Sequence, residues 1–313
     1  MKKYAFGRIG ILMGGPSTER EVSLKSGRAV YETLKNLRLD IVAIDIKTDA
    51  RKENMRLIRS HGLDCVFLAL HGRFGEDGSI QKILDELDLP YTGSGKSASE
   101  LAMDKIASRR IFKAGNLPVP EYRVYRKSGY KKGLMPKDMS WPLVVKPSSH
   151  GSSIGLSIVD NKKRFAKAVD LAFSFDQRII IEAYIKGREV TVGILDDRAL
   201  PVVEIIPKRR FFDYEAKYHA GMTDYVVPAE IAKGVSKKTQ RAALSAHKLL
   251  GCSGCSRVDI ILSEGGIPFI LEINSIPGFT PTSLLPKAAR AAGIDFEQLC
   301  LRLIELSYEK KQD

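Results

Sequence analysis

The chain has 313 residues, of which 44% are hydrophobic and 28% are charged, a composition typical of a globular protein with two or three domains. No apolar run reaches the length of a membrane span, and the run near the start is too short for a signal peptide. The net charge of +13 suits acidic partners such as nucleotides, but there is no long basic tail and no basic stripe interleaved with aromatic residues, so the sequence argues against nucleic-acid binding.

Four cysteines do not form a disulfide framework in a chain of this length, which favours the cytoplasm. Cys252 and Cys255 have the spacing of half a zinc site or of a redox pair. There is no second such pair and no matching pair of histidines, so we favour two buried thiols.

Strands and helices alternate through residues 1–94, which predicts a small parallel sheet in a Rossmann-like domain. The expected strands are 8–13, 40–46, 64–70 and a short one near 90–93, and the expected helices are 21–37, 51–60 and 78–88.

Two polar residues follow the carboxyl ends of these strands, where α/β sheets bind ligands. Glu19 falls in the first turn of a helix, and a carboxylate there could hold a substrate ammonium group. His71 precedes a charged, glycine-rich loop. An acid at a helix start and a structural histidine are common alternatives, so neither residue is decisive alone.

Residues 95–181 form a second unit with a helix at 97–114, a strand at 142–147 and a helix at 161–174. The strand ends in Lys146 and leads into a loop of small residues that ends near Leu156. Such a loop lets backbone N–H groups approach phosphate oxygens, and the lysine adds a charge. We predict a phosphate flap, although it is no Walker loop, and a flexible hairpin tip is the alternative.

Residues 182–313 form a third unit. At its start, Glu182 ends an apolar strand with a carboxylate, as in a nucleotide hinge. The mixed aromatic and charged segment 208–228 has the composition of a lid over a site. Helices are expected at 236–250, 284–292 and 295–311.

Residues 257–274 read as two strands around Gly265-Gly266, which predicts a hairpin with a two-residue turn of positive φ. Symmetry about this turn places Asp259 opposite Glu272 and Arg257 opposite Asn274, with all four side chains on one face.

The two facing carboxylates would lie about 5 Å apart at Cβ, an arrangement that is destabilising unless a cation neutralises it. Carboxylate and amide oxygens suit Mg²⁺, which keeps other positions for water and phosphate. Asp259, Glu272 and Asn274 are therefore candidate Mg²⁺ ligands. A solvent-facing hairpin with ordinary charges is the alternative, and the apolar strands argue against it.

Several segments, in this order, resemble the ATP-grasp D-alanine–D-alanine ligases over nearly the whole chain. They are GGPSTEREVS at 14–23, LHGRFGEDG at 70–78, MDK at 103–105, LPVP at 117–120, VVKPSSHGSSIGLS at 144–157, EAKY at 215–218, SRVDIIL at 256–262 and LEINSIPGFTPTSLLP at 271–286. Each segment is moderately specific, and their order and spacing together are very specific.

The resemblance implies an α/β (α+β) protein with the ATP-grasp fold. Its parts would be an N-terminal Rossmann-like substrate domain at 1–94, a central subdomain with the phosphate flap at 95–181, and a C-terminal mixed-sheet subdomain with the lid and the Mg²⁺ site at 182–313. It also implies a cytoplasmic homodimer that uses ATP and D-alanine, with two Mg²⁺ ions, for which Mn²⁺ could substitute.

By position, the resemblance assigns roles to individual residues. The implied nucleotide residues are Lys105, Lys146, Ser152, Glu182, Ala183, Ile185, Glu189, Phe211 and Lys217. The implied metal ligands are Asp259, Glu272 and Asn274. The implied catalytic residues are Glu19, Ser152, Tyr218, Arg257, Gly278 and Ser283, and the implied substrate-binding residues are Glu19, His71, Lys217, Arg257 and Ser283.

The predicted activity is ATP-dependent formation of D-alanyl-D-alanine, through D-alanyl phosphate, for peptidoglycan synthesis. The alternative is a related ligase that takes D-serine, D-lactate or another amino acid as the second substrate. His150 stands where relatives often carry an acid, which would change the charge of the flap.

Overall fold

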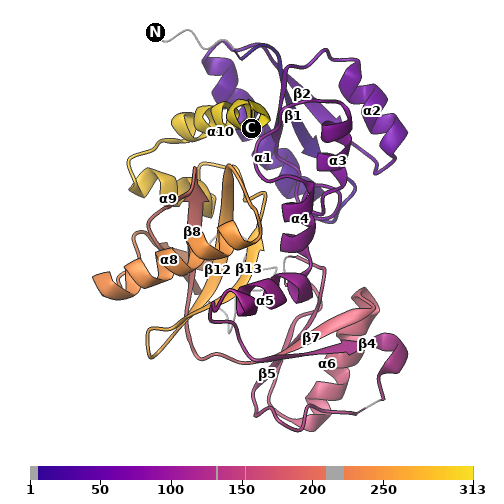
Figure 1. The fold of residues 1–313 in the computed structure, drawn as a ribbon, viewed down its shortest axis with the longest axis vertical. Coiled ribbons are helices and arrows are strands. Elements are labelled where there is room, and N and C mark those ends of the chain that lie inside the picture. Colours follow the sequence, from indigo (N-terminus) through magenta and orange to yellow (C-terminus); the bar gives the residue numbers. More distant parts are fainter. Residues whose placement is uncertain (1–5, 132, 152, 209–221, 313) are drawn as a thin grey trace.

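The computed structural model describes residues 6–131, 133–151, 153–208 and 222–312. Three β-sheets succeed one another along the long axis, and we call them the N-terminal, central and C-terminal sheets according to their strands (Figure 1). In Figure 1 the N-terminal sheet lies at the top, the central sheet at the bottom and the C-terminal sheet between them.

The N-terminal sheet has the order β2-β1-β3 and is parallel throughout, as predicted. All residues of its middle strand are buried, as expected for a parallel strand that helices cover on both faces. The predicted strand near 90–93 is reduced to a single bridge between Val66 and Tyr91. The elements are β1 (Ile9–Gly14), α1 (Arg20–Asn36), β2 (Ile41–Ile46), α2 (Arg51–Arg59), β3 (Cys65–Leu68) and α3 (Ser79–Glu86).

The C-terminal end of the chain returns to this first sheet. Helix α10 (Phe296–Gln312) contacts α1 and β3, and Figure 1 shows the yellow helix beside the indigo elements. The N-terminal sheet and the C-terminal helices therefore share one apolar core.

The single helix predicted at 97–114 is wrong, because two helices occupy this stretch. They are α4 (Lys96–Met103) and α5 (Lys105–Ala114), with Asp104 between them in an extended conformation (φ −82°, ψ 97°). The Asp104 carboxylate accepts hydrogen bonds from the backbone N–H groups of Ile106 and Ala107, which caps α5. The break lies where the chain passes from the N-terminal part to the other two sheets.

The central sheet is antiparallel, in the order β4-β7-β5-β6, and α6 (Lys162–Phe175) packs on it. Phe165 and Val169 of this helix bury their side chains against Leu143, Val145 and Ile181. The strands are β4 (Tyr122–Arg126), β5 (Leu143–Pro147), β6 (Ser157–Val159) and β7 (Arg178–Ala183), and a short 3₁₀ turn covers Lys127–Gly129.

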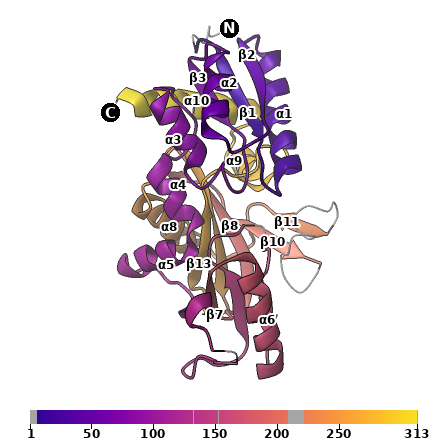
Figure 2. The same ribbon diagram turned by 90° about the vertical axis from the view of Figure 1, so that its right-hand side faces the viewer.

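The C-terminal sheet has the order β11-β10-β8-β12-β13, with β9 paired to β8. Every strand pair in this sheet is antiparallel, so the mixed sheet that the resemblance implied for this part is wrong. Figure 2 shows β10 and β11 projecting to one side of the molecule. The elements are β8 (Gly187–Leu195), β9 (Arg198–Ala199), β10 (Val203–Pro207), β11 (Thr223–Val226), α8 (Lys233–Leu249), β12 (Cys255–Ser263), β13 (Pro268–Asn274) and α9 (Leu284–Ala291).

The hairpin of β12 and β13 has the predicted pairs but a different turn. Asp259 lies opposite Glu272, and Arg257 lies opposite Asn274. The two-residue turn is wrong, because Ser263 and Ile267 close a three-residue loop in which only Gly266 has positive φ (70°). A bulge between Asp259 and Ile260 then shifts the register back by one residue.

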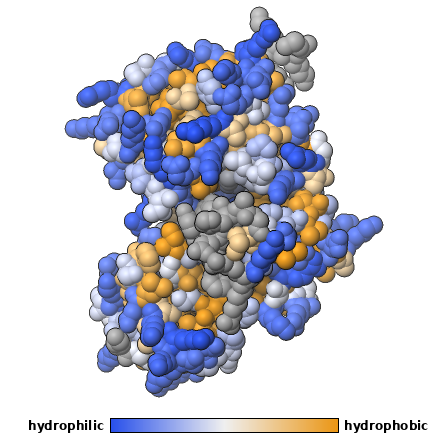
Figure 3. Space-filling view, turned by 180° about the vertical axis from the view of Figure 1, so that it is seen from behind, coloured by the Kyte–Doolittle hydropathy of each residue, from blue (hydrophilic) through white to orange (hydrophobic). Residues whose placement is uncertain are grey.

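All four cysteines are buried free thiols, which confirms the interpretation of Cys252 and Cys255. Burial raises the pKa of Cys255 to about 12. Within the described ranges, no helix is long and apolar enough to cross a membrane. The face seen in Figure 3 mixes hydrophilic and hydrophobic residues at both ends of the molecule.

Candidate active site

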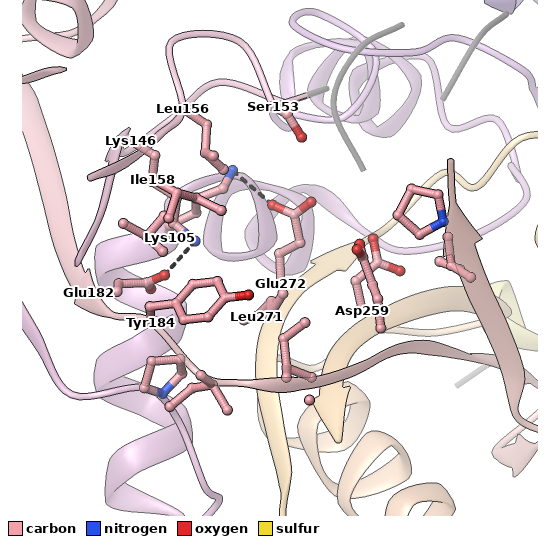
Figure 4. Close-up of a pocket in the computed structure, with 18 of the residues that line it drawn as sticks. Lys105, Lys146, Ser153, Leu156, Ile158, Glu182, Tyr184, Asp259, Leu271 and Glu272 are labelled. Carbon is pink, nitrogen blue, oxygen red and sulfur yellow. Dashed lines mark ion pairs between the residues drawn. The ribbon is translucent and has the colours of Figure 1, made fainter. Parts of the chain in front are cut away.

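A cavity of about 310 Å³ lies between the central and C-terminal sheets, and α5 contributes Lys105 to its wall. Figure 4 shows two ion pairs in this cavity, Lys146 with Glu182 and Lys105 with Glu272, with Asp259 beyond Glu272. One wall comes from the central sheet and the other from the C-terminal hairpin, so the relative position of the two sheets determines the width of the cavity.

Apolar side chains line the part of the cavity next to the connection between β7 and β8. Ala183 ends β7, Tyr184 and Ile185 belong to the connection, and Leu271 and Ile158 contribute further apolar surface. Glu189, on β8, lines the same cavity. An apolar lining with a carboxylate beside it suits a heterocyclic base attached to a group that carries hydroxyls.

A buried group of charges lies at the base of the cavity. The Glu182 carboxylate is 2.7 Å from Lys146 Nζ and 2.6 Å from a guanidinium nitrogen of Arg109. Burial opposes ionisation of Glu182, but the positive charges of Arg109 and Lys146 keep its pKa below the usual value. Burial lowers the pKa of Lys146, and the negative charge of Glu182 opposes this shift.

Lys105 links the hairpin to the flap. Its ammonium group is 3.1 Å from Glu272 Oε2 and donates a hydrogen bond of 2.8 Å to the carbonyl oxygen of His150. Its backbone N–H also bonds the carbonyl oxygen of Ser148, at 2.9 Å. The base of the flap is therefore tied to the first turn of α5.

Asp259 accepts hydrogen bonds on both carboxylate oxygens. Oδ1 is 2.7 Å from Thr191 Oγ1 and 2.9 Å from Arg257 Nε, and Oδ2 is 2.8 Å from a second Arg257 nitrogen and 3.1 Å from Asn274 Nδ2. These contacts use the lone-pair positions of an ionised carboxylate. The two facing acids thus each have a cationic neighbour, Arg257 for Asp259 and Lys105 for Glu272. Neutralisation of the two carboxylates therefore does not depend on a metal ion alone, in contrast to the prediction from the sequence.

The same three residues nevertheless fit a hard divalent cation. Asp259, Glu272 and Asn274 lie at paired or adjacent same-face positions of β12 and β13 and offer carboxylate and amide oxygens. A metal ion that binds Asp259 must displace at least one of its present donors. Of these donors, Thr191, Arg257 and Asn274, only Arg257 is cationic.

A second cavity, of about 620 Å³, lies between the N-terminal part and the flap. Glu19 lines it at the start of α1 with only 9% of its surface exposed. The Gly72 backbone lies close to this carboxylate: a Cβ atom on Gly72 would be 2.6 Å from Glu19 Oε2. Gly151 of the flap faces the same carboxylate, since its Cβ would lie 3.7 Å away.

His71 is buried, and both of its ring nitrogens have protein partners. Nε2 is 3.0 Å from Ser26 Oγ, and Nδ1 is 3.2 Å from the carbonyl oxygen of Ile276. Burial lowers the pKa of His71, which keeps the ring neutral. These contacts favour a histidine that connects the N-terminal sheet to the loop after β13.

Gly278 and Ser283 lie together in that loop. Ser283 is the residue before the first turn of α9, and its Oγ is 2.7 Å from Thr280 Oγ1. A Cβ atom on Gly278 would come within 2.9 Å of this hydroxyl, so only glycine lets the chain pass so near. The Gly278 backbone and the Ser283 hydroxyl group therefore lie close together.

Of the predicted nucleotide residues, the structure describes six, and all six line the first cavity: Lys105, Lys146, Glu182, Ala183, Ile185 and Glu189. The predicted Ser152, Phe211, Lys217 and Tyr218 lie outside the described residues.

Two charged residues received no role from the sequence. Arg109 is fully buried beside Glu182. Glu76 accepts a hydrogen bond of 2.7 Å from the Gly72 N–H, and burial together with the charge of Glu19 raises its pKa to about 8. Only the presence of Glu76 in the GRFGEDG segment could have drawn attention to it.

Family models for two parts of one enzyme match most of the chain. The model "D-ala D-ala ligase N-terminus" matches residues 8–55 and 48–94, and "D-ala D-ala ligase C-terminus" matches residues 111–305.

Curated relatives agree with these models. The chain is 48% identical to a D-alanine–D-alanine ligase of Geotalea uraniireducens over 297 residues, which covers 95% of this chain and 94% of the relative. It is 46% identical to one of Pelotomaculum thermopropionicum over 312 residues, which covers 96% and 97% of the two chains.

Solved structures show the same fold. The D-alanine–D-alanine ligase of Bacillus anthracis superposes with a TM-score of 0.86 at 37% identity, and its complex with ATP with 0.85 at 33%, each over 98% of this chain and 99% of the other. The VanG D-Ala:D-Ser ligase of Enterococcus faecalis has a TM-score of 0.84 at 31% identity and covers 96% of this chain and 99% of its own. The fold is thus the predicted ATP-grasp fold, and the chain belongs to the family of D-alanine–D-alanine ligases.

Proposed function

We propose that the protein joins two D-alanines to D-alanyl-D-alanine while converting ATP to ADP and phosphate, for use in peptidoglycan synthesis. Membership of the ligase family supports the reaction. The observation that carries the assignment of the site is that one cavity between two sheets is lined by two lysines together with the facing acids of the hairpin: Lys105, Lys146, Asp259 and Glu272.

ATP binds with its base against the apolar lining and its phosphates toward Lys105 and Lys146. Support comes from the six predicted nucleotide residues in this one cavity and from the ATP complex of the Bacillus anthracis ligase, whose fold this chain shares. Glu189, in the same cavity, is suited to accept hydrogen bonds from ribose hydroxyls.

Asp259, Glu272 and Asn274 would hold Mg²⁺ next to the phosphates, and a bound divalent cation there would neutralise the transferring phosphoryl group. Since Arg257 now contacts Asp259, a metal ion in its place would leave the guanidinium free for a developing oxyanion. Mn²⁺ could bind in the same site, because it also prefers carboxylate and carbonyl oxygen ligands.

The reaction needs two steps, because a carboxylate has a poor leaving group for attack by an amine. The carboxylate of the first D-alanine attacks the γ-phosphorus of ATP, and ADP leaves. The amine of the second D-alanine then attacks the carbonyl carbon of the acyl phosphate, loses a proton, and phosphate leaves with the broken C–O bond.

The residues of this chain bind and orient the two amino acids. Glu19 holds the ammonium group of the first D-alanine, with His71 nearby, and Arg257 with the Gly278 N–H stabilises the oxyanion. Ser283 and Lys217 bind the carboxylate of the second. Ser152 and Tyr218, with Glu19, close the flap and the lid, which keeps water from the acyl phosphate.

A second candidate is a ligase whose second substrate is D-serine, because the structure of the VanG D-Ala:D-Ser ligase matches nearly the whole chain. The greater identity to D-alanine–D-alanine ligases favours the dipeptide of two D-alanines. A homodimer and a cytoplasmic location, both implied by the family, complete the proposal.

The test is a panel of second substrates with ATP, Mg²⁺ and D-alanine, with products identified by mass. We expect D-alanyl-D-alanine as the main product and release of phosphate only when D-alanine is present. Preferential formation of D-alanyl-D-serine or D-alanyl-D-lactate would contradict the assignment of the second substrate, and phosphate release without D-alanine would contradict the reaction.

A further inference from the structure

Arg109 lies in the middle of α5 with none of its surface exposed, and it does not line the nucleotide cavity. Its guanidinium group donates a hydrogen bond of 2.8 Å from Nε to Glu182 Oε1 and another to the carbonyl oxygen of Ile270. One arginine thus joins α5 to β7 of the central sheet and to β13 of the C-terminal sheet. The proposed reaction gives this buried charge no task.

Glu182 divides its two oxygens between two cations. Oε1 contacts Arg109, and Oε2 is 2.7 Å from Lys146 Nζ. Arg109 is fully buried and Lys146 lines the cavity, so only Lys146 can reach a ligand. The three groups together carry a net charge of +1, since Arg109 compensates Glu182 and leaves the charge of Lys146 in excess.

A phosphate near Lys146 competes with Glu182 for its ammonium group. If Glu182 had no other cation, the departure of Lys146 would leave a buried carboxylate alone, and such a group takes up a proton. Arg109 remains in place because its helix and its bond to Ile270 hold it there. The carboxylate then keeps a partner on the oxygen that Lys146 does not use.

We propose that Arg109 is a positioning residue that keeps Glu182 ionised while Lys146 moves from Glu182 to the nucleotide phosphates, so that nucleotide binding takes up no proton. This inference rests on the proposed phosphate contact of Lys146. It adds to the nucleotide site a residue that touches no part of the nucleotide.

Other titratable groups near Glu182 are few. Lys105 on α5 and Glu272 on β13 form their own pair at 3.1 Å, and Tyr122 on β4 lies opposite Glu182 in the sheet register. The positive charges of Arg109 and Lys146 account for the lowered pKa of Glu182, and that of Arg109 is the larger contribution. Loss of Arg109 therefore leaves Lys146 as the cation that keeps Glu182 ionised.

The experiment compares wild type with Arg109→Gln, Arg109→Lys and Arg110→Gln, and it uses ADP with Mg²⁺ as the ligand. Arg110 is the exposed neighbour on the same helix, so its variant is a matched control for the change in charge. Calorimetric titrations in two buffers of different ionisation enthalpy, near pH 8 where the phosphates are ionised, give the number of protons taken up.

We expect no net uptake for wild type, Arg109→Lys and Arg110→Gln. Arg109→Gln should take up close to one proton per ADP, and its Kd should rise about tenfold per pH unit. A structural role alone would change the stability or the Kd of this variant without linking binding to a proton. Binding by Arg109→Gln with no more proton uptake than wild type would overturn the proposal.

Difference infrared spectra of wild type, with and without ADP, supply a second measurement should Arg109→Gln fail to fold. We expect no band of a protonated carboxyl group on binding. Such a band in wild type that is missing in Glu182→Gln would also overturn the proposal. A wild type that binds no nucleotide would instead contradict the proposed function, so the two failures are distinguishable.

Discussion

Burial and the charge of Glu19 raise the pKa of Glu76 to about 8. In the unfolded chain this carboxyl group ionises near its ordinary pKa of 4.5. Between these two values the folded protein holds a proton that the unfolded chain has lost. The free energy of unfolding therefore falls as the pH rises through this window.

We predict that Glu76→Gln removes this pH dependence, because glutamine keeps an acceptor for the Gly72 N–H and carries no charge. Denaturant unfolding at about pH 6 and about pH 8 should show wild type losing stability with a slope of up to about 1.4 kcal/mol per pH unit more than the variant. Equal slopes for the two proteins would mean that Glu76 is ionised in the folded state.

At the level of single residues, the alternation of side chains in a strand was enough to predict that Asp259, Glu272 and Asn274 share a face with Arg257. This alternation could not predict that Arg257 contacts Asp259 or that Lys105 contacts Glu272. Rotamers and contacts between distant segments do not follow from a local sequence pattern. Arg109 was missed for the same reason, since an arginine within a helix ordinarily faces solvent.

The hairpin shows how a correct register can follow from an incorrect turn. Two adjacent glycines predicted a two-residue turn, whereas the chain forms a three-residue loop with Gly266 at positive φ. The bulge after Asp259 compensates for the extra loop residue. A bulge in an apolar strand has no recognisable sequence signature, so neither difference could be predicted from the sequence.

The flap is held at its base by Asp176, the residue that follows α6. Its Oδ2 is within 2.8 to 3.1 Å of the backbone nitrogens and the hydroxyl groups of Ser148 and Ser149. Burial opposes its ionisation, but hydrogen bonds from the Arg178 N–H and the two serines keep the pKa of Asp176 below its usual value. One carboxylate therefore orients Ser148 and Ser149, the two residues at the base of the flap.

We predict that Asp176→Ala raises the KM for ATP by about tenfold and releases more phosphate per dipeptide, because a loosely held flap admits water to the acyl phosphate. Simultaneous assays of phosphate and dipeptide measure both effects, and Asp160→Ala, an exposed acid before α6, is the matched control. A ratio of phosphate to dipeptide that matches wild type would show that Asp176 does not control the flap.

For the whole molecule, the order of strands and helices predicted the parallel N-terminal sheet, and the family resemblance predicted the ATP-grasp fold. The resemblance also implied a mixed C-terminal sheet, whereas all strand pairs of that sheet are antiparallel. The predicted boundaries at residues 94 and 181 stay predictions. The break at Asp104 was not foreseen, because the apolar pattern of one helix continues into the next and aspartate both caps helices and occurs inside them. This break allows α5 to pack between the two sheets that form the nucleotide cavity.

The proposed reaction depends on the acids of the β12–β13 hairpin acting on ATP together with the two lysines of the same cavity. The direct test is the rate of ADP formation by wild type, Asp259→Asn and Glu272→Gln, with and without D-alanine and Mg²⁺. Glu264→Gln, an exposed acid at the tip of the same hairpin, is the matched control. We predict that wild type and the control require both D-alanine and Mg²⁺, and that each of the other two variants, still folded, loses about 100-fold or more of the rate. A rate within about twofold of wild type in either variant, or ADP formation that needs no D-alanine, would contradict the account.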